Sequence, residues 1–354
     1  MRTLTGTPPG DRATADRADT LLYLTGDDVR AACRFVDPVS AVRSALEAHA
    51  RGATVLPPEA YLAWQSTDGG AARSLVLPGL VEQPVRAVGA KIINANVGNP
   101  DRGLPRAAGL TVLFDPETAR PRTVMEGAHL SAVRTAAASL LAVQHLGPPR
   151  PRVLALLGSG RLARAHLDLF ADRLPGLAQV RVFDIDRGRA RALAAERAGP
   201  VPVTVTTDAR SAVLGADIVV PVTTATDGYL PLAWLAPGAI LVHVSLDDAE
   251  PDVVFGADLV VVDDWALVAA DGRRLLGRMV HTGQLCGPDE VCPPGARRVD
   301  AELGDILLGR HPGRRRDNDI VLVNPFGLAI EDVAVAAEIE RAATAAGLGR
   351  RLPR

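Results

Sequence analysis

The feature that most constrains this chain is a glycine-rich stretch in its middle, VLALLGSGRLARAHLDLF, residues 153 to 170. An apolar run leads directly into two glycines, and apolar residues at helical spacing follow at once. A buried strand, a tight turn and a helix in this order predict a βα unit that presents its helix N-terminus to an anion. Because the unit begins only at residue 153, the chain must hold a second substantial part in front of it.

The turn fits the dinucleotide fingerprint GxGxxG/A. Gly158 permits the tight turn, Gly160 lets the backbone approach a pyrophosphate, and the small Ala163 lets the helix pack close to the strand. The helix N-terminus offers unpaired N–H groups and the positive end of its dipole to the phosphates. The predicted cofactor ligands in this turn are Gly158, Ser159, Gly160, Arg161, Leu162 and Ala163.

An acidic residue at the end of the next predicted strand bears on which dinucleotide binds. Asp184 ends the run VRVFD, where a carboxylate accepts hydrogen bonds from the adenosine ribose. Its charge repels a 2′-phosphate, so the sequence favours NAD over NADP. Arg187 and Arg189 lie close downstream and weaken this preference.

The second half of the chain alternates strands with helices. From Arg152 onward, six Val-, Ile- and Leu-rich runs are separated by turns and helical segments. Continuous apolar strands of this kind are typical of a parallel sheet that is covered on both faces. The sequence therefore predicts an α/β fold with a doubly wound Rossmann domain.

The first half reads differently. Residues 21–50 predict one strand and one helix, and three β-rich runs punctuated by Gly, Pro and Asn predict a hairpin-linked antiparallel sheet. Residues 130–146 predict a helix that Ser131 caps. The final amphipathic helix is expected to return to this α+β part, so the Rossmann domain is an insertion. We expect a disordered leader (1–18), a substrate-binding and dimerisation domain (19–140 plus 322–354) and an NAD-binding domain (141–321).

Composition excludes several classes of partner. The 39 basic and 41 acidic residues nearly cancel, so no overall field recruits nucleic acid or an anionic membrane. No apolar run has the length of a signal peptide or a membrane span. Three cysteines without CxxC spacing argue against a disulfide framework and against a zinc site, and a reducing cytoplasm fits them best. We therefore expect a cytoplasmic protein with a small-molecule partner and no metal.

The segment GAKIINANVGNPDRGLPRAAGLTVLFDPETARPRTVMEGAHLSAVRTAAASLLAV resembles the ornithine cyclodeaminase/μ-crystallin family. The motif RTAAAS, the central GxGxxA and the closing GLAIED carry the resemblance, which spans about residues 20 to 345. It implies a homodimeric enzyme. In such an enzyme the N-terminal segment and the last helix form a substrate and dimerisation domain around an inserted Rossmann domain. The long first half would then supply the substrate side of the cleft.

The resemblance also assigns roles to single residues. Lys91 matches the family's lysine for the substrate carboxylate, with a catalytic role as well, and Arg134 matches its substrate-binding arginine. These assignments agree with the chemistry, because a carboxylate needs fixed cationic donors and a guanidinium can bind it through two hydrogen bonds. Thr135 matches the threonine that contacts the cofactor phosphate, and Thr223 is also expected among the cofactor ligands.

The predicted catalytic carboxylate follows the fifth strand of the Rossmann part. Asp247 matches the family's catalytic aspartate, and its neighbour Asp248 competes for the role. A carboxylate at the carboxyl end of a parallel strand can reach the nicotinamide, accept a proton from an amine or orient water toward an imine. The chain also lacks the family's early arginine, for which Arg73 or Arg86 is the possible substitute.

Departures from the cyclodeaminase pattern favour one branch of the family. Residues 245–248 read SLDD where cyclodeaminases carry GD-PGK. The short motifs EG at 126, PRA at 105 and VNPFG at 323 resemble the siderophore-pathway branch. That branch is an NAD-dependent N-(1-amino-1-carboxyethyl)glutamate dehydrogenase, which releases 2,3-diaminopropionate and 2-oxoglutarate from an N-linked glutamate adduct. We therefore predict an NAD-dependent oxidoreductase that acts on a C–N bond of an amino-acid substrate.

Three alternatives remain open from the sequence. The first is an ornithine cyclodeaminase, which converts ornithine to proline and regenerates NAD in each turnover. The second is a related amino-acid dehydrogenase or ketimine reductase. The third is a binder of dinucleotides or small ligands without catalytic activity, against which Lys91, Arg134 and Asp247 argue.

Overall fold

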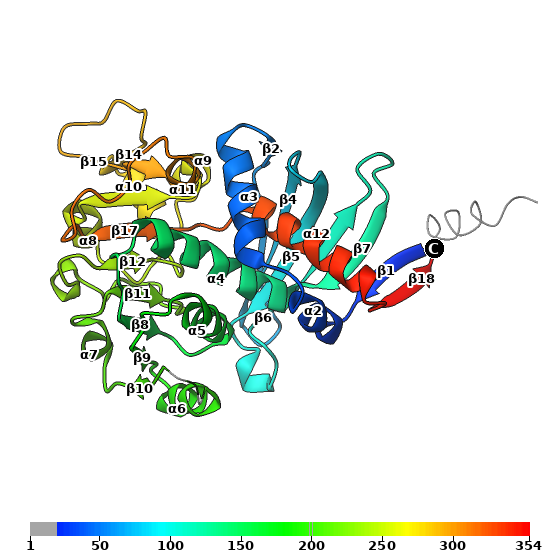
Figure 1. The fold of residues 1–354 in the computed structure, drawn as a ribbon, viewed down its shortest axis with the longest axis horizontal. Helices are drawn as coiled ribbons and strands as arrows, with labels where there is room; N and C mark the ends of the chain where they lie inside the picture. Colours follow the sequence, from blue (N-terminus) through cyan, green and yellow to red (C-terminus); the bar gives the residue numbers. More distant parts are fainter. Residues whose placement is uncertain (1–19, 198, 200) are drawn as a thin grey trace, which may run out of the picture. The chain divides into compact units, whose positions relative to one another are not determined.

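The computed structural model describes residues 20–354 apart from 198 and 200 (Figure 1). The predicted leader, residues 1–18, lies outside the described residues. The chain forms two compact units. One is built from residues 20–37, 54–130 and 332–354, and the other from residues 38–53 and 131–331.

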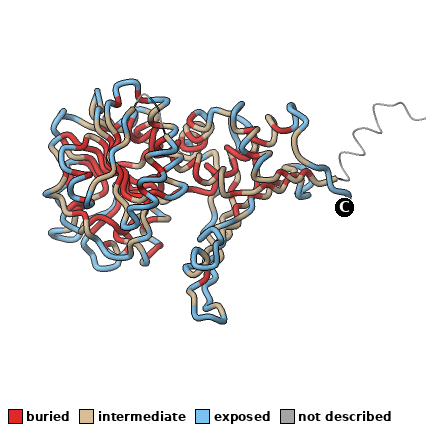
Figure 2. Tube along the Cα trace, turned by 90° about the horizontal axis from the view of Figure 1, so that it is seen from below, coloured by how far each residue is buried: buried red, intermediate tan, exposed pale blue. Residues whose placement is uncertain are grey.

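The second unit contains an all-parallel sheet of eight strands, which confirms the predicted α/β class. Their order is β10-β9-β8-β11-β12-β17-β13-β16. In Figure 2 the strands of this sheet form a block of buried residues, as their Val- and Leu-rich sequences require. The strands are β8 (Val153–Leu157), β9 (Gln179–Phe183), β10 (Val203–Val205), β11 (Ile218–Pro221), β12 (Ile240–Val242), β13 (Leu259–Val262), β16 (Ala301–Glu302) and β17 (Val321–Asn324).

The six strands predicted for this sheet are all present. Strand β16 is additional, and β17, which was predicted as a strand of the substrate-binding domain, joins the same sheet. Strand β17 enters between β12 and β13, with Val321 opposite both Ile240 and Leu259. Residues 322–331 therefore belong to the parallel-sheet unit, whereas the sequence placed them in the substrate-binding domain. The apolar run at 321–323 forms its backbone hydrogen bonds in the middle of the sheet. Of the C-terminal segment, only residues 332–354 belong to the other unit.

Helices α3 to α11 accompany this sheet. Helix α3 also belongs to this unit, because it packs closely on α11: a Cβ at Gly304 would lie 2.8 Å from the Cβ of Ala50. Helix α4 begins at Gly127, so Ser131 lies within it and is not its cap as predicted. The helices are α3 (Pro38–Ala50), α4 (Gly127–Leu146), α5 (Arg161–Arg173), α6 (Arg187–Glu196), α7 (Ala209–Val213), α8 (Pro251–Gly256), α9 (Trp265–Ala270), α10 (Leu275–His281) and α11 (Leu303–Leu307).

The first unit contains a mixed sheet in the order β18-β1-β7-β6-β5-β4-β2, with β3 also paired to β4. The neighbours are antiparallel except β1 and β7, which run parallel. The predicted single helix of residues 21–50 is two helices, because Pro38 starts α3 after a break. The elements of this unit are β1 (Thr20–Leu24), α2 (Gly26–Cys33), β2 (Thr54–Val55), β3 (Ala60–Gln65), β4 (Ala71–Val81), β5 (Ala87–Asn96), β6 (Ala107–Phe114), β7 (Pro121–Glu126), β18 (Arg350–Pro353) and α12 (Ala329–Ala345) from Asp332 onward.

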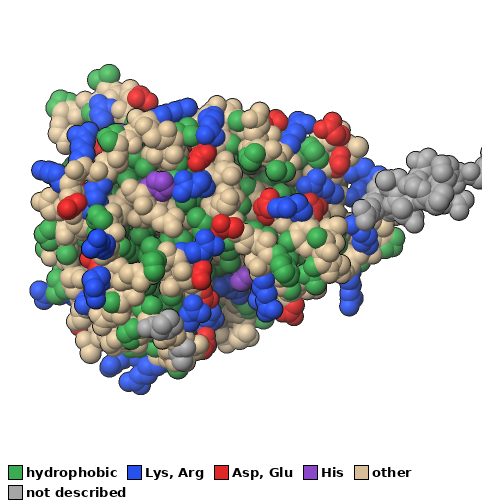
Figure 3. Space-filling model, in the orientation of Figure 1, with side chains coloured by type: hydrophobic (Ala, Val, Ile, Leu, Met, Phe, Trp, Pro, Cys, Tyr) green, Lys and Arg blue, Asp and Glu red, His purple; other side chains and the backbone are tan. Residues whose placement is uncertain are grey.

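The surface charges, the helix lengths and the positions of possible metal ligands bear on which partners the protein can bind. On the face shown in Figure 3, Lys and Arg side chains are interspersed with Asp and Glu. Among the described helices, none is long and apolar enough to cross a membrane. The described part of the chain also has no cluster of three or more His, Cys, Asp and Glu side chains that could hold a metal ion.

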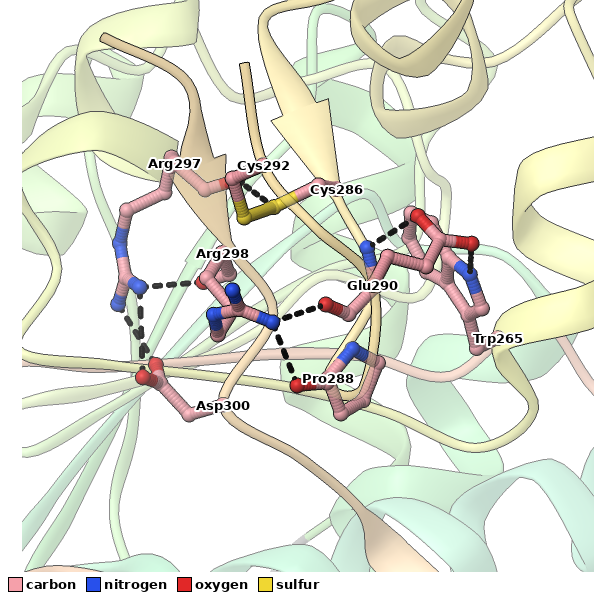
Figure 4. Close-up of a disulfide and its surroundings, with 9 residues drawn as sticks. Trp265, Cys286, Pro288, Glu290, Cys292, Arg297, Arg298 and Asp300 are labelled. Carbon is pink, nitrogen blue, oxygen red and sulfur yellow. Dashed lines mark hydrogen bonds and ion pairs between the residues drawn. A yellow bond between two sulfur atoms is a disulfide. The ribbon is translucent and has the colours of Figure 1, made fainter. Parts of the chain in front are cut away.

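Two cysteines form a disulfide, although the number and spacing of the cysteines argued against a disulfide framework. Cys286 and Cys292 are bonded across a loop that joins two short parallel strands, β14 (Leu285–Cys286) and β15 (Arg297–Arg298). Figure 4 shows Glu290 inside this loop, where its carboxylate accepts a hydrogen bond from Trp265 Nε1 at 2.8 Å. The number and spacing of the cysteines did not predict this bond, because the two cysteines come together only when β14 and β15 pair.

The disulfide has a direct chemical test. When the protein is unfolded in denaturant without reductant, iodoacetamide should label Cys33 alone, since Cys33 is the free cysteine. After reduction, Cys286 and Cys292 should be labelled as well. Mass spectrometry of peptides gives the site of each label, and a Cys33→Ser variant is the matched control. Labelling of all three cysteines before reduction would show that the disulfide is absent.

Candidate functional site

The glycine turn has the geometry that a dinucleotide pyrophosphate requires. Gly158 has φ +98°, and a Cβ at this position would lie 2.9 Å from the carbonyl oxygen of Val222. Gly160 precedes α5 as its N-cap, and a Cβ there would meet no atom within 4 Å. Ala163 is fully buried, so α5 packs closely on the sheet. The first glycine is therefore needed by the fold, and the second leaves open space at the helix N-terminus.

Asp184 lies against this turn. Its Oδ2 accepts hydrogen bonds from the backbone N–H and the hydroxyl of Ser159, at 2.8 Å and 2.6 Å. Its Oδ1 accepts a hydrogen bond from the N–H of Asp186 at 2.8 Å. The structure therefore brings the predicted ribose ligand and the predicted pyrophosphate loop together, while Arg161 is exposed at the start of α5.

Thr135 is held on α4 by a chain of hydrogen bonds that reaches α5. Its hydroxyl donates to the carbonyl of Ser131 at 2.7 Å, and its own carbonyl accepts from Ser139 Oγ at 3.0 Å. Ser139 Oγ lies 2.8 Å from Nε2 of His166. Burial lowers the pKa of His166 to about 4, so this ring is neutral at pH 7. The contact fixes α4, and Thr135 with it, beside the helix that follows the glycine turn.

Arg134, also on α4, is a buried cation with a carboxylate partner. Its side chain donates to Glu331 Oε2 at 2.8 Å, and only 8% of the residue is exposed. The guanidinium lies directly on the backbone of Gly327, whose added Cβ would be 2.6 Å from Nη1. Gly327 has φ +94°, which also favours glycine. The sequence identified Arg134 but gave no sign of its partner Glu331.

Asp247 lies in the loop after β12 and is 3% exposed. Both carboxylate oxygens accept charged hydrogen bonds, from Arg274 at 2.7 Å and from Arg278 at 3.0 Å. The preceding residue, Leu246, has φ +73°, an uncommon conformation for a branched side chain. Backbone strain of this kind concentrates at functional sites. The two arginines, one turn apart on α10 and its N-cap, were not predicted as site residues.

Asp248 has a different environment, made of hydroxyl groups. It is fully buried, and its carboxylate accepts hydrogen bonds from Tyr229 at 2.9 Å and from Thr223 and Ser245. Burial and the Asp248 charge raise the pKa of Tyr229 above its ordinary value, so Tyr229 stays a donor. Thr223 is therefore tied to one of the two predicted carboxylates, and the hydroxyl network connects the loops that follow β11 and β12.

His243 binds the backbone of the same loop. Its Nε2 accepts the backbone N–H groups of Asp248 and Ala249 at 3.0 Å and 3.2 Å, which requires a neutral ring nitrogen. Burial lowers the pKa of His243, in agreement with that role. His243, Ser245 and Tyr229 were not predicted as site residues. Their spacing carries no signal, because they meet Asp248 only after the strands align.

Lys91 and Arg73 lie in the mixed-sheet unit. Lys91 on β5 is 5% exposed, and its Nζ forms an ion pair with the fully buried Asp332 at 3.1 Å. Lys91 is opposite Leu77 and Arg73 is opposite Ala95, four residues further along each strand, so Lys91 and Arg73 project from the same face. Arg86, the other proposed substitute, instead pairs with Glu82 and Glu117 on the surface. Arg73 therefore shares a face of the sheet with Lys91, whereas Arg86 is held at the surface by two carboxylates.

The closing motif supplies carboxylates to both predicted substrate cations. Asp332 pairs with Lys91, and the preceding residue, Glu331, pairs with Arg134. A buried charge that loses its partner is strongly destabilised, so each cation is held in one place. The sequence singled out the GLAIED motif by resemblance but assigned no role to its two acids.

The strand order β10-β9-β8-β11-β12, with a glycine turn after β8, defines a dinucleotide-binding protein of the Rossmann class. Comparison with known proteins then gives the family. The sequence model of the "Ornithine cyclodeaminase/mu-crystallin family" matches residues 21–346. The chain therefore belongs to the ornithine cyclodeaminase/mu-crystallin family, as its motifs predicted.

Individual relatives are similar over nearly the whole chain. The N-((2S)-2-amino-2-carboxyethyl)-L-glutamate dehydrogenase of Staphylococcus aureus is 30% identical over 94% of this chain and 98% of its own length. The crystal structure of CmnK has a TM-score of 0.87 with 39% identity, covering 94% of this chain and 98% of that one. An archaeal alanine dehydrogenase dimer with bound NAD has a TM-score of 0.80 with 25% identity, over 94% and 99% of the two chains.

Proposed function

We propose that this protein oxidises an N-linked glutamate adduct at its carbon–nitrogen bond, with release of 2,3-diaminopropionate and 2-oxoglutarate. The observation that carries the proposal is the 30% identity, over 94% of the chain, with an N-((2S)-2-amino-2-carboxyethyl)-L-glutamate dehydrogenase. The broader class is firm: the protein is an NAD-dependent dehydrogenase of its family, and its cofactor is NAD, which the related alanine dehydrogenase also binds. The siderophore or natural-product pathway stays part of the proposal.

The residues fit NAD, because Gly158 and Gly160 form a turn that a pyrophosphate can approach and Asp184 lies beside it. When bound, NAD accepts the hydride that leaves the glutamate α-carbon. Loss of the amine proton then gives a C=N bond, and water adds to its carbon. Breaking the C–N bond yields 2-oxoglutarate and the free amine of 2,3-diaminopropionate, so atoms and electrons balance.

The site residues have separate proposed roles. Asp247 accepts the proton or orients the water, and the guanidinium groups of Arg274 and Arg278 fix its carboxylate. Lys91 and Arg134 bind substrate carboxylates, each from its own buried position. Arg73 is a further proposed carboxylate ligand. Asp248 holds Thr223, Ser245 and Tyr229 together and is the alternative catalytic carboxylate.

We also propose that the protein is a homodimer. Strand β3 is exposed along its whole length, and it presents the large apolar side chains Tyr61, Leu62 and Trp64 to solvent. An exposed apolar edge strand is a risk for aggregation unless another chain covers it. The related alanine dehydrogenase was crystallised as a dimer.

The fate of the hydride separates this function from cyclodeamination. With N-((2S)-2-amino-2-carboxyethyl)-L-glutamate and NAD, the protein should form one NADH per 2-oxoglutarate released, because a dehydrogenase does not return the hydride. Absorbance of NADH and mass spectrometry of the products measure both. Ornithine should give neither NADH nor proline. Conversion of ornithine to proline and ammonia without net NADH would replace the proposed function by the cyclodeaminase alternative.

A further inference from the structure

Asp263 is a buried aspartate outside the proposed active-site loops. It is hydrogen-bonded to Gly327, against which the guanidinium of Arg134 packs. Asp263 follows β13 directly and is 2% exposed. Its Oδ2 accepts the backbone N–H of Gly327 at 2.6 Å, and its Oδ1 accepts the N–H of Asp264 at 3.0 Å. The parallel pairing of Val262 with Asn324 brings these two strand ends to the same edge of the sheet. Asp263 therefore fixes the turn that follows β17.

The same turn contacts the proposed substrate arginine. The guanidinium of Arg134 lies so close to Gly327 that an added Cβ would be 2.6 Å from Nη1 and 3.1 Å from Nη2. Glu331, a few residues further along, accepts a hydrogen bond from the same Nη1 at 2.8 Å. A displacement of Gly327 would therefore move the surface against which this guanidinium is packed.

We propose that Asp263 is a positioning residue for Arg134, and that it sets the affinity for the substrate carboxylate through its hydrogen bond to Gly327. The proposal rests on the proposed role of Arg134 in binding substrate. Asp263 takes no part in the chemical step. Its loss should therefore raise KM for the amino-acid substrate and leave kcat and the affinity for NAD unchanged.

Asp263 can change its charge in an accessible pH range. Burial raises its pKa to about 6, although backbone N–H groups, first that of Gly327, oppose the shift. Protonation removes the negative charge and places an O–H on one oxygen, so the carboxyl accepts the two N–H groups less strongly. The contact with Gly327 is thus complete above about pH 6 and weakens as the pH falls through this value.

Other ionisable groups lie on the elements packed around Asp263, and the effect of their titration must be distinguished from that of Asp263. His49 of α3 forms an ion pair with Asp264 at 2.8 Å, and hydrogen bonding to Asp264 raises the pKa of His49. Burial raises the pKa of Glu302, which accepts the N–H of Trp265. Arg134, which lies against Gly327, and its partner Glu331 are also charged.

The test compares Asp263→Asn with the unmodified protein by the ratio of their KM values between pH 5 and pH 8. Asparagine keeps one acceptor oxygen, but its NH₂ group faces an N–H donor. The ratio should therefore be about two to ten at pH 8, the value expected for one hydrogen bond. It should fall toward one at pH 5, where Asp263 is itself protonated. Titration of the substrate amine cancels in the ratio.

Two further variants serve as controls. Asp264→Asn breaks the His49 pair while Asp263 stays intact, so its KM ratio should not decline with pH in this way. Gly327→Ala displaces the guanidinium directly and should raise KM at every pH, which also tests the contact if Asp263→Asn does not fold. Binding of NAD to each variant shows whether it is folded.

The outcomes distinguish the two proposals. If Arg134→Ala leaves KM unchanged, the role of Arg134 in the proposed function is wrong. If Arg134→Ala raises KM but the Asp263→Asn ratio is one throughout, or is the same at every pH, the positioning role of Asp263 is wrong. A pH-dependent ratio in Asp264→Asn would assign the effect to the His49 pair and overturn it as well.

Discussion

Replacing Asp247 by asparagine is expected to lower kcat by about 10²- to 10⁴-fold, the usual contribution of a general acid or base. The amide keeps the shape of the side chain but cannot accept the proton. The dissociation constant of NAD should stay within a factor of about two, because the glycine turn is not changed. Steady-state kinetics at saturating NAD and calorimetric titration with NAD measure the two quantities.

Asp271→Asn is the matched control for this variant. Asp271 is 9% exposed and accepts two hydrogen bonds from the guanidinium of Arg273, at 2.6 Å and 2.9 Å. It therefore resembles Asp247 in burial and pairing but has no proposed catalytic role, and its variant should keep kcat. If Asp247→Asn keeps kcat while Asp248→Asn loses it, the catalytic role passes to Asp248.

Replacing Gly158 by alanine should weaken NAD binding by about tenfold or more and lower the stability of the fold. A left-handed backbone costs a residue with a Cβ about 1–2 kcal/mol. The Cβ would also lie 2.9 Å from the backbone oxygen of Val222, which cannot move without disturbing β11. Calorimetry gives the melting temperature, and titration with NAD gives the dissociation constant.

Gly160→Ala provides the contrast. A Cβ at Gly160 would meet no atom within 4 Å, so the melting temperature should be unchanged. NAD binding should still weaken, because the methyl group would occupy the space through which the pyrophosphate approaches. Unchanged affinity in Gly160→Ala would contradict the placement of the pyrophosphate over this glycine.

The parts of the fold that could be predicted from the sequence are those determined by one continuous segment of the chain. The glycine turn, the strand before it and the helix after it lie within residues 153 to 173, and their order alone defines the unit. The central apolar strands of the parallel sheet were equally clear, because burial on both faces favours Val, Ile and Leu along the whole strand. Strand β17 was assigned to the wrong part, since nothing local indicates that it pairs between β12 and β13.

The candidate site divides in the same way. Lys91, Arg134 and Asp247 could be found by resemblance, but their partners could not. Glu331, Asp332 and the two arginines beside Asp247 meet these residues only through tertiary packing. The disulfide was missed for a related reason, since an odd number of cysteines says nothing about which pair the chain brings together.

The central position of β17 also sets the order in which the chain can fold during synthesis. Strands β12 and β13 emerge from the ribosome well before residues 321–324, which fill the gap between them. Until then their facing edges have no partner, and the nascent parallel sheet stays open at its middle. A chain whose synthesis stops before β17 would therefore be a target for chaperones and proteases, although its glycine turn and most of its strands are already complete.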